Sequence, residues 1–303
     1  MAQDHRIQAQ RWELKYLIDE SLTPSIRDFV SAYLELDEFG IGWPNLSYPV
    51  HTLYLDSDDL RTFQASVNGS KNRFKLRLRY YDNKPNSPVF FEIKAREDNC
   101  ILKQRCPVRR SAVPLLVAGQ LPSPEQLLSK EVRHLATLQK FNLLQHQLKA
   151  GPKTHNSYFR EAWVSPNDNS LRITIDRQVR SEPYFKDDAP IKMENPTPVF
   201  SEATILELKF TTRYPVWFAE MVRVFHLMQF SASKYCEGVI LLGESRFHDD
   251  YDARDWEGRA PRTAEGIAAR PAAKLVPDSR ISTTGSFFPG GSALTESAER
   301  KVA

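Results

Sequence analysis

The side chains best suited to chemistry in this sequence are cations that alternate with apolar residues. Residues 74–81 read Phe-Lys-Leu-Arg-Leu-Arg-Tyr-Tyr, and in a strand this spacing places Lys75, Arg77 and Arg79 on one face. Arginine forks and lysine ammonium groups are well matched to phosphate oxygens. A single strand of this kind is most simply an amphipathic strand with a solvated face, so recurrence on other strands decides between the two interpretations.

The same alternation recurs on three other segments. The residues that share a face there are Glu92, Lys94 and Arg96, then Lys103 and Arg105, then Arg172, Thr174 and Asp176. The formal net charge of the chain is only +3, but the window from Lys71 to Arg110 holds 12 Lys+Arg against 4 Asp+Glu. Like charges that face each other across strands destabilise a sheet by about 0.2–1 kcal/mol per pair. A sheet with this many cations on one face is therefore expected to hold an anionic partner.

Carboxylates enter the same pattern through a repeated Glu-x-Lys triplet. The triplets are Glu13-Leu14-Lys15, Glu92-Ile93-Lys94 and Glu207-Leu208-Lys209. In a strand, the Glu and the Lys of each triplet project from the same face. Two interpretations are open: the carboxylates only neutralise the cations, or at least one of them binds Mg²⁺ or Mn²⁺, the hard cations that bridge phosphate oxygens.

Segments of period two dominate residues 11–244 and predict strands. They are residues 11–18, 49–56, 73–81, 89–96, 101–109, 157–164, 171–179 and 203–211. Turn residues at 68–69 and 82–86 indicate an antiparallel meander in the middle. We expect an α+β fold, a mostly antiparallel β-barrel with helices packed outside. Closure of this kind covers the apolar face and makes the charged face an interior channel.

Three helices are predicted between the strands. In the first, Thr23 is the expected N-cap and Pro24 the first helical residue, followed by an apolar stripe. The second is expected to begin at residues 123–126, where Ser-Pro-Glu-Gln matches a capping box. The third follows Pro215 and carries Phe218 on its apolar side.

The chain has 303 residues, of which 41% are apolar and 26% charged, as in globular proteins. It lacks a stretch of the roughly 18–20 apolar residues that a membrane span requires, and a secretion signal. Cys100, Cys106 and Cys236 form neither an even disulfide set nor a metal pair. These features predict a cytoplasmic protein with an extension at residues 1–10, a folded domain at 11–244 and a disordered tail at 245–303.

Other phosphate and nucleic-acid sites are disfavoured. The sequence lacks a Gly-x-x-x-x-Gly-Lys-Ser/Thr loop, and Gly40-Ile41-Gly42 lacks the third glycine of a dinucleotide motif. An exposed nucleic-acid surface interleaves aromatic side chains with cations on one face. Here Tyr80 lies on the face opposite to Arg77 and Arg79, so nucleic acid is not an expected partner.

Eight segments share their order and spacing with one known family. They are RWELKYLI (11–18), TLYLD (52–56), RFKLRLRYY (73–81), FEIK (91–94), YFREA (158–162), RITID (172–176), LELK (206–209) and SKY (233–235). Together they resemble the VTC domain, the polyphosphate polymerase module of the vacuolar transporter chaperone complex and its bacterial relatives. That domain belongs to the triphosphate tunnel metalloenzymes, alongside the CYTH proteins. The resemblance covers about residues 8 to 244.

The resemblance implies a β-tunnel in which a metal-bound ATP gives its γ-phosphate to a growing polyphosphate chain. By position, it implies Arg77, Arg79, Lys94, Arg172 and Lys234 as catalytic phosphate ligands, and Lys15, Lys75, Arg96, Lys103, Arg160 and Lys209 as substrate-binding residues. It implies Glu207, with Glu13 and Glu92, as ligands of Mn²⁺ or Mg²⁺. The expected partners are ATP and polyphosphate or pyrophosphate.

The chain also departs from the family pattern. The Glu-x-Glu-x-Lys motif of the wider superfamily begins here with Arg11, which removes one possible metal carboxylate. An SPX domain and a membrane region are absent from the sequence, which is similar to the free-standing bacterial type, so any coupling to export requires a separate membrane protein. Two alternatives stay open: an inorganic or nucleoside triphosphatase of the same fold, and a non-catalytic module that binds polyphosphate or inositol phosphates.

Overall fold

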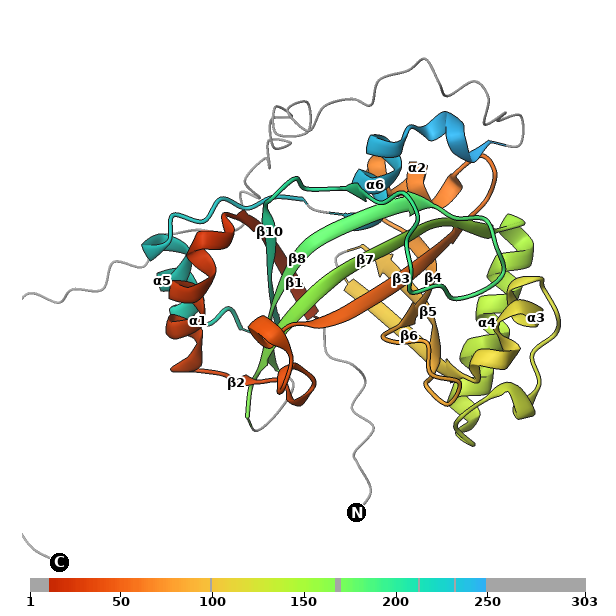
Figure 1. Ribbon diagram of the computed structural model, residues 1–303, viewed down its shortest axis with the longest axis horizontal. Helices are drawn as coiled ribbons and strands as arrows, with labels where there is room; N and C mark the ends of the chain where they lie inside the picture. The colour runs from red at the N-terminus through yellow and green to blue at the C-terminus, as the bar shows by residue number, and fades with distance from the viewer. Residues whose placement is uncertain (1–10, 99, 167–169, 212, 232, 249–303) are drawn as a thin grey trace, which may run out of the picture. The chain divides into compact units, whose positions relative to one another are not determined.

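The computed structural model describes residues 11–248 except for residues 99, 167–169, 212 and 232 (Figure 1). The strands in this part of the chain form one sheet of ten. They are β1 (Arg11–Ile18), β2 (Glu35–Leu36), β3 (Tyr48–Asp56), β4 (Arg73–Tyr80), β5 (Val89–Glu97), β6 (Cys100–Val108), β7 (Gly151–Val164), β8 (Leu171–Pro183), β9 (Thr197–Pro198) and β10 (Thr204–Thr211). The two short strands, β2 and β9, pair with β7 and β8 beside the main path.

The main strands follow the order β1-β10-β8-β7-β3-β4-β5-β6, and all neighbours are antiparallel. Strands β3 to β6 form the predicted meander. Among the described residues, no strand pairing joins β1 to β6 at the two ends of the path. The antiparallel sheet is therefore confirmed, whereas its closure into a barrel is not. The sheet nevertheless curls. This is shown by the Lys94 ammonium on β5, which lies 3.2 Å from the Glu13 carboxylate on β1, although these two strands are not neighbours.

Helices cover the apolar face of the sheet in two groups (Figure 1). The helices are α1 (Thr23–Ser31), α2 (Arg61–Val67), α3 (Val113–Val117), α4 (Val132–Leu148), α5 (Val216–Val224) and α6 (Lys234–Leu242). Helices α1 and α5 pack on the part formed by β1, β10 and β8, and helices α3 and α4 on the part formed by β3 to β6. Helices α1, α4 and α5 lie outside the sheet, as predicted, and so does α3, while α2 and α6 pack against each other.

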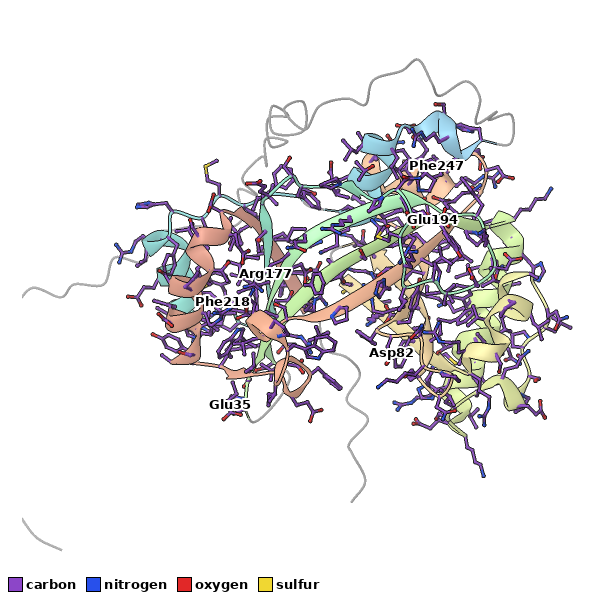
Figure 2. All side chains as sticks on the ribbon, viewed as in Figure 1. Glu35, Asp82, Arg177, Glu194, Phe218 and Phe247 are labelled. Carbon is purple, nitrogen blue, oxygen red and sulfur yellow. The ribbon has the colours of Figure 1, made fainter. Side chains whose placement is uncertain are left out.

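The apolar residues that alternate with the charged ones explain this coverage. On β4, Leu76 and Leu78 are fully buried and pack against a cluster that includes Phe141 of α4. In the other group, Phe218 of α5 is fully buried beside Ile173 of β8 (Figure 2). Burial of one large apolar side chain contributes about 1.5–3 kcal/mol. The apolar face therefore attaches the sheet to its helices and leaves the other face for charged groups.

The second predicted helix begins later than expected. The capping box at residues 123–126 is present, but it caps a single 3-10 turn. The chain then turns extended, and Leu127 pairs with Val108 at the edge strand β6. Because these backbone groups bond to the sheet instead of to a helix, α4 starts only at Val132.

One other helix prediction needs correction, and three helices were not predicted. Thr23 is the first residue of α1 and Leu22 occupies the cap position without a side-chain bond, so Thr23 is not the N-cap. Helices α2, α3 and α6 have no counterpart in the sequence prediction. Ser233 caps α6, and its Oγ accepts a hydrogen bond from the Cys236 N–H at 3.3 Å.

The predicted extension at residues 1–10 and most of the predicted tail lie outside the described residues, and both stay predictions. Of the tail, residues 245–248 are described, and there Phe247 is buried against α2 and α6 (Figure 2). Among the described helices, none is long and apolar enough to cross a membrane.

Asp56, the last residue of β3, ties α2 and α6 to the sheet. Its carboxylate is fully buried. Oδ1 accepts a hydrogen bond from the Thr62 N–H at 2.9 Å, and Oδ2 accepts bonds from the Phe63 N–H at 2.9 Å and the Tyr235 hydroxyl at 2.7 Å. The first N–H groups of a helix have no acceptor within the helix, so this carboxylate supplies one for α2.

We expect Asp56→Asn to lower the free energy of unfolding by about 3 kcal/mol or more. The amide nitrogen cannot accept the bonds from Phe63 and Tyr235, and each lost bond to a charged group costs about 1.5–3 kcal/mol. Urea denaturation followed by circular dichroism measures the change. Asp59→Asn is the matched control, because Asp59 forms an exposed pair with Arg61 and should change stability by less than about 1 kcal/mol. Equal losses in the two variants would contradict the role of Asp56.

Candidate anion-binding site

Strand register brings the predicted cations and carboxylates to one face of the sheet. Residues directly opposite each other in antiparallel strands project to the same side. The opposed pairs are Glu13 with Lys209, Lys15 with Glu207, Lys209 with Arg172, Glu207 with Thr174, Arg160 with Asp176, Thr52 with Arg79, Tyr54 with Arg77, Arg77 with Glu92, Lys75 with Lys94, Glu92 with Arg105, Lys94 with Lys103, and Arg73 with Arg96. We call this surface the charged face. It contains every predicted site residue that lies on a strand, and Lys234 begins α6.

Three lysines form a row across β4, β5 and β6. Lys75 lies opposite Lys94, which lies opposite Lys103. Burial lowers the pKa of Lys94 to about 8 and that of Lys103 to about 7, although Glu13 and Glu92 partly oppose the shift. Like charges in directly opposed positions repel, so an anion placed over this row is stabilised by it.

Glu92 is the counter-ion of this part of the face. Its carboxylate is fully buried and lies 2.8 Å from Arg77, 2.8 Å from Lys103 and 3.6 Å from Arg105. Burial raises the pKa of this carboxyl, but the neighbouring cations outweigh burial and hold the pKa well below its usual range. Glu92 is therefore ionised, and its contacts fit the interpretation in which a carboxylate neutralises the cations around it.

Glu13 and Glu207 form a second carboxylate cluster on β1 and β10. Lys15 lies 3.1 Å from Glu13 and 3.7 Å from Glu207, while Lys209 lies 2.8 Å from Glu207. Burial raises the pKa of both carboxyls. The ammonium groups of Lys94, Lys15 and Lys209 lower it by more, so both pKa values lie below their usual range. Two ionised carboxylates thus share Lys15, whose own pKa they raise despite its burial.

A third cluster surrounds Asp176 and joins α6 to the sheet. The Arg160 guanidinium donates two hydrogen bonds of 2.7 Å to the Asp176 carboxylate, and the Lys234 ammonium lies 2.7 Å from the same group. Both cations lie over the Tyr158 ring, 5.2 and 4.7 Å from its centroid. Burial raises the pKa of Asp176, but Arg160 and Lys234 lower it below its usual range. Two predicted phosphate ligands are thus positioned by one buried carboxylate.

Helix α6 packs against the charged face itself. A Cβ at Gly238 would lie 2.7 Å from Ser181 Oγ and 3.3 Å from Asn156 Nδ2, so this close approach requires glycine. Asn156 Nδ2 also donates a hydrogen bond to the Lys234 carbonyl at 3.2 Å. The Lys75 ammonium donates to the hydroxyl of the α6 N-cap residue at 2.9 Å. These contacts place Lys234 over the strands and cover part of the charged face.

Arg79, like Arg105, has a buried Nε that forms no hydrogen bond among the described residues. Its side chain is buried, and one terminal nitrogen donates to Thr52 Oγ1 at 3.3 Å. Within the described part of the chain, its Nε has no hydrogen-bond partner. A buried donor without an acceptor costs about 1–3 kcal/mol. An anionic ligand that supplies an acceptor oxygen would remove this cost.

Arg172 and Arg96 lie on the charged face but outside the three clusters. Arg172 forms an ion pair of 2.7 Å with Asp37, which follows β2. Arg96 Nε donates to the Asp98 carbonyl at 2.9 Å. The catalytic and binding roles of both stay predictions.

The residues present fit a divalent metal at Glu13 and Glu207. In the described ranges, no group of three or more His, Cys, Asp and Glu side chains is arranged to hold a metal. Mg²⁺, however, is commonly held by one or two carboxylates together with substrate phosphates. Two adjacent ionised carboxylates supply that donor set, whereas Glu92 lies among cations of β4 and β6.

Sequence reasoning missed two tyrosines of the charged face. Tyr54 receives an Arg77 hydrogen bond at 3.5 Å. Burial raises the pKa of its phenol, but Arg77 and Arg79 outweigh burial and lower it to about 8. Tyr158 lies under Arg160 and Lys234. The available signal was strand alternation, which places Tyr54 on the same face as Thr52.

Comparison with known proteins identifies the family of this chain. A family model of the VTC domain matches residues 10–242, which include all ten strands and α6. The chain belongs to the VTC domain family. A curated relative, the Vacuolar transporter chaperone complex subunit 4 of Schizosaccharomyces pombe, is 22% identical over 206 residues. The matched part covers 61% of this chain and 28% of that subunit, so the VTC domain corresponds to one part of a longer protein.

Two solved structures are similar at a low level. The PH1819 protein from Pyrococcus horikoshii OT3 is 12% identical, with a TM-score of 0.38 over 75% of this chain and 96% of that one. A putative adenylate cyclase from Vibrio parahaemolyticus is 12% identical, with a TM-score of 0.37 over 74% of this chain and 95% of that one. Scores this low establish neither a shared fold nor a shared function.

Binding of a polyanion to this VTC domain should take up protons near neutral pH. Because burial lowers the pKa of Lys94 to about 8 and of Lys103 to about 7, both are partly deprotonated at about pH 8 before an anion binds. An anion favours their charged forms, so the affinity for tripolyphosphate should fall as the pH rises from about 7 to about 9. Calorimetry in buffers of different ionisation enthalpy measures the proton uptake.

A double variant, Lys94→Met with Lys103→Met, should lose most of this uptake, since titration of the ligand is common to both proteins. Lys192→Met is the control, because Lys192 is exposed. Without ligand, stability of the unchanged protein should rise from about pH 7 to about pH 10, because the unfolded lysines bind more protons there than the folded ones. Equal proton uptake by the double variant and the unchanged protein would contradict this prediction.

Proposed function

We propose that this VTC domain is a polyphosphate polymerase that transfers the γ-phosphate of ATP to the end of a polyphosphate chain. The observation that carries the proposal is the row of Lys75, Lys94 and Lys103 beside Arg79, whose buried Nε has no partner among the described residues. Membership of the VTC domain family supports it.

The spacing of the cations favours a ligand with several linked phosphates. Lys75 and Arg79 lie on the same strand and face, four residues apart. At about 3.3 Å per residue, their Cα atoms are about 13 Å apart. A triphosphate or a longer chain can follow the strand past both side chains without either having to bend toward the other.

The proposed reaction needs little covalent chemistry from the protein. An oxygen of the chain-end phosphate attacks the γ-phosphorus and forms a new P–O–P linkage. The bond from the γ-phosphorus to the bridging oxygen breaks, and that oxygen leaves with ADP. The attacking oxygen is already anionic at neutral pH, so no general base is required. Catalysis then consists of positioning and charge stabilisation by Arg77, Arg79, Lys94 and Lys234.

Mn²⁺ or Mg²⁺ would be held by Glu13 and Glu207, where it would supply charge neutralisation to phosphate oxygens. The protein residues around it hold the carboxylates ready: Lys15 and Lys209 keep them ionised and in place without ligand.

Partners and location follow from the substrates. We propose a cytoplasmic location, where ATP is available as the phosphate donor. The relative named above is a subunit of a transporter chaperone complex, and we propose a separate membrane protein as the partner that couples synthesis to export here.

Phosphorus NMR of the purified chain with ATP and Mn²⁺ tests the proposal, and we expect a growing signal from internal phosphates of a chain. Arg79→Met should reduce the rate by about 10²-fold or more, the usual loss when one donor to a developing charge is removed. Arg79 is a better choice than Arg77, because removal of Arg77 leaves the buried Glu92 without its closest arginine and risks misfolding. Glu207→Gln should abolish the signal from internal phosphates.

Arg180→Met is the matched control, because Arg180 is an exposed arginine on β8 and should leave the rate unchanged. Release of orthophosphate alone would replace the polymerase with a triphosphatase, in which water takes the place of the chain end. Unchanged ATP together with tight binding of added polyphosphate would replace it with a non-catalytic binding module.

A further inference from the structure

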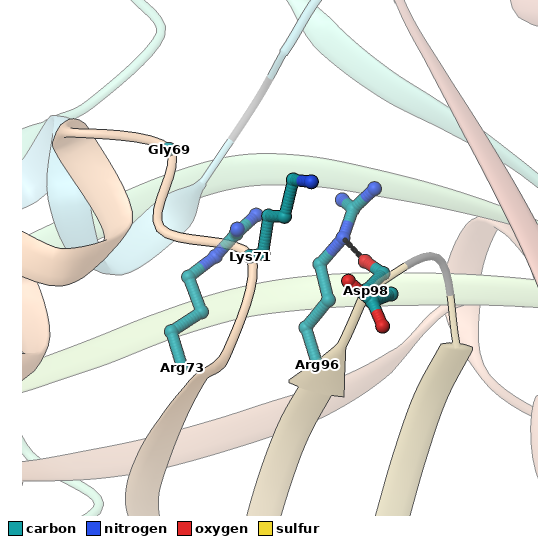
Figure 3. Close-up of a pocket in the computed structure, with 5 residues that line it drawn as sticks. All are labelled: Gly69, Lys71, Arg73, Arg96 and Asp98. Atoms are coloured by element: carbon teal, nitrogen blue, oxygen red, sulfur yellow. Dashed lines mark hydrogen bonds between the residues drawn. The ribbon is translucent and has the colours of Figure 1, made fainter.

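A basic pocket lies at the end of the β4–β5 hairpin that is remote from its turn (Figure 3). Its volume is about 360 Å³, and its lining residues are Gly69, Lys71, Arg73, Arg96 and Asp98. Neither Lys71 nor Arg73 is among the residues that the family resemblance implies.

Strand register connects this pocket to the charged face. Arg73 lies opposite Arg96, two residues beyond the opposed pair of Lys75 and Lys94. Two residues of a strand span about 7 Å, so the pair of arginines is the next step of the same ladder of cations. The pocket is therefore a continuation of the charged face at the end of these two strands.

Both arginines are anchored by the backbone. Arg73 donates a hydrogen bond to the Ser70 carbonyl, and Arg96 Nε donates to the Asp98 carbonyl at 2.9 Å. Figure 3 shows Lys71, Arg73 and Arg96 pointing in the same direction, with the Asp98 carboxylate turned away from the guanidinium heads. These bonds hold the two arginines in place, so their remaining donors can meet an anion without a large loss of side-chain freedom.

The cations of the three clusters on the charged face are paired with carboxylates, and the two arginines of this pocket differ from them in this respect. In the part of the chain that the structure describes, neither Arg73 nor Arg96 forms an ion pair with a carboxylate, in contrast to Arg77 with Glu92. Burial and the charge of Arg96 also lower the pKa of Arg73. Two facing arginines in this setting are stabilised by an anion between them.

We infer that this pocket, the mouth subsite, binds the part of a polyphosphate chain that extends beyond the row of lysines. The inference rests on the proposed function and adds a length requirement to it. A chain that reaches Lys71, Arg73 and Arg96 binds more tightly than tripolyphosphate, and the growing product dissociates later once it is long enough to reach them.

The test compares tripolyphosphate and long-chain polyphosphate as probes, by calorimetry at about 0.1 M salt. Lys71→Met with Arg73→Met should weaken binding of the long chain by about tenfold or more, since the loss of a single charge-assisted bond already costs about tenfold, and leave tripolyphosphate unchanged. With ATP and Mn²⁺, the same variant should release shorter products. Lys84→Met is the matched control, since Lys84 is exposed in the turn at the other end of the same hairpin; it should change neither affinity.

Lys71→Met alone, which alters an exposed side chain, should weaken long-chain binding in the same direction and guards against misfolding of the double variant. An unchanged long-chain affinity in the double variant, or an equal loss for both probes, would overturn the mouth subsite and leave the proposed function standing. Failure of the unchanged protein to bind either probe would overturn both.

Discussion

Electrostatic repulsion between cations on one face of a sheet is the constraint on which the rest of this structure depends. Lysines and arginines of neighbouring strands lie directly opposite each other, as Lys75, Lys94 and Lys103 do. Such a face is stable only with fixed negative charge among the cations. The fold supplies it at three places, through Glu92, through Glu13 with Glu207, and through Asp176.

The opposite face of the same strands carries most of the packing. Leu76 and Leu78 alternate with Arg77 and Arg79, and they are buried under the α3–α4 group. Because helices hold the sheet from the apolar side, the charged face need not contribute a hydrophobic core. Helix α6 is the exception, since Gly238 lets it approach the charged face and place Lys234 beside Asp176.

The carboxylates do not neutralise all of the cations on the charged face, and this links the stability of the fold to ligand binding. Glu92 offsets Arg77 and Lys103, but Arg79 keeps an unpartnered Nε in the described structure, and burial lowers the pKa of Lys94 and Lys103 to near neutrality. A polyanion would accept a hydrogen bond from Arg79 and would favour the charged forms of Lys94 and Lys103. In the proposed function, part of the free energy of binding would therefore come from relief of the charge repulsion that folding itself introduces.

The sequence by itself determined which side chains share a face, because strand alternation is a local property: Lys75, Arg77 and Arg79 lie together as their spacing predicts. The family also follows from the order of local segments. Only the tertiary structure decided which charges meet, as in the pairs of Lys94 with Glu13 and Arg160 with Asp176. Those pairs depend on the curl of the sheet and on strand order, and so do burial and the resulting pKa values. The start of α4 was likewise decided by pairing of Leu127 with β6, a contact between segments that no local pattern contains.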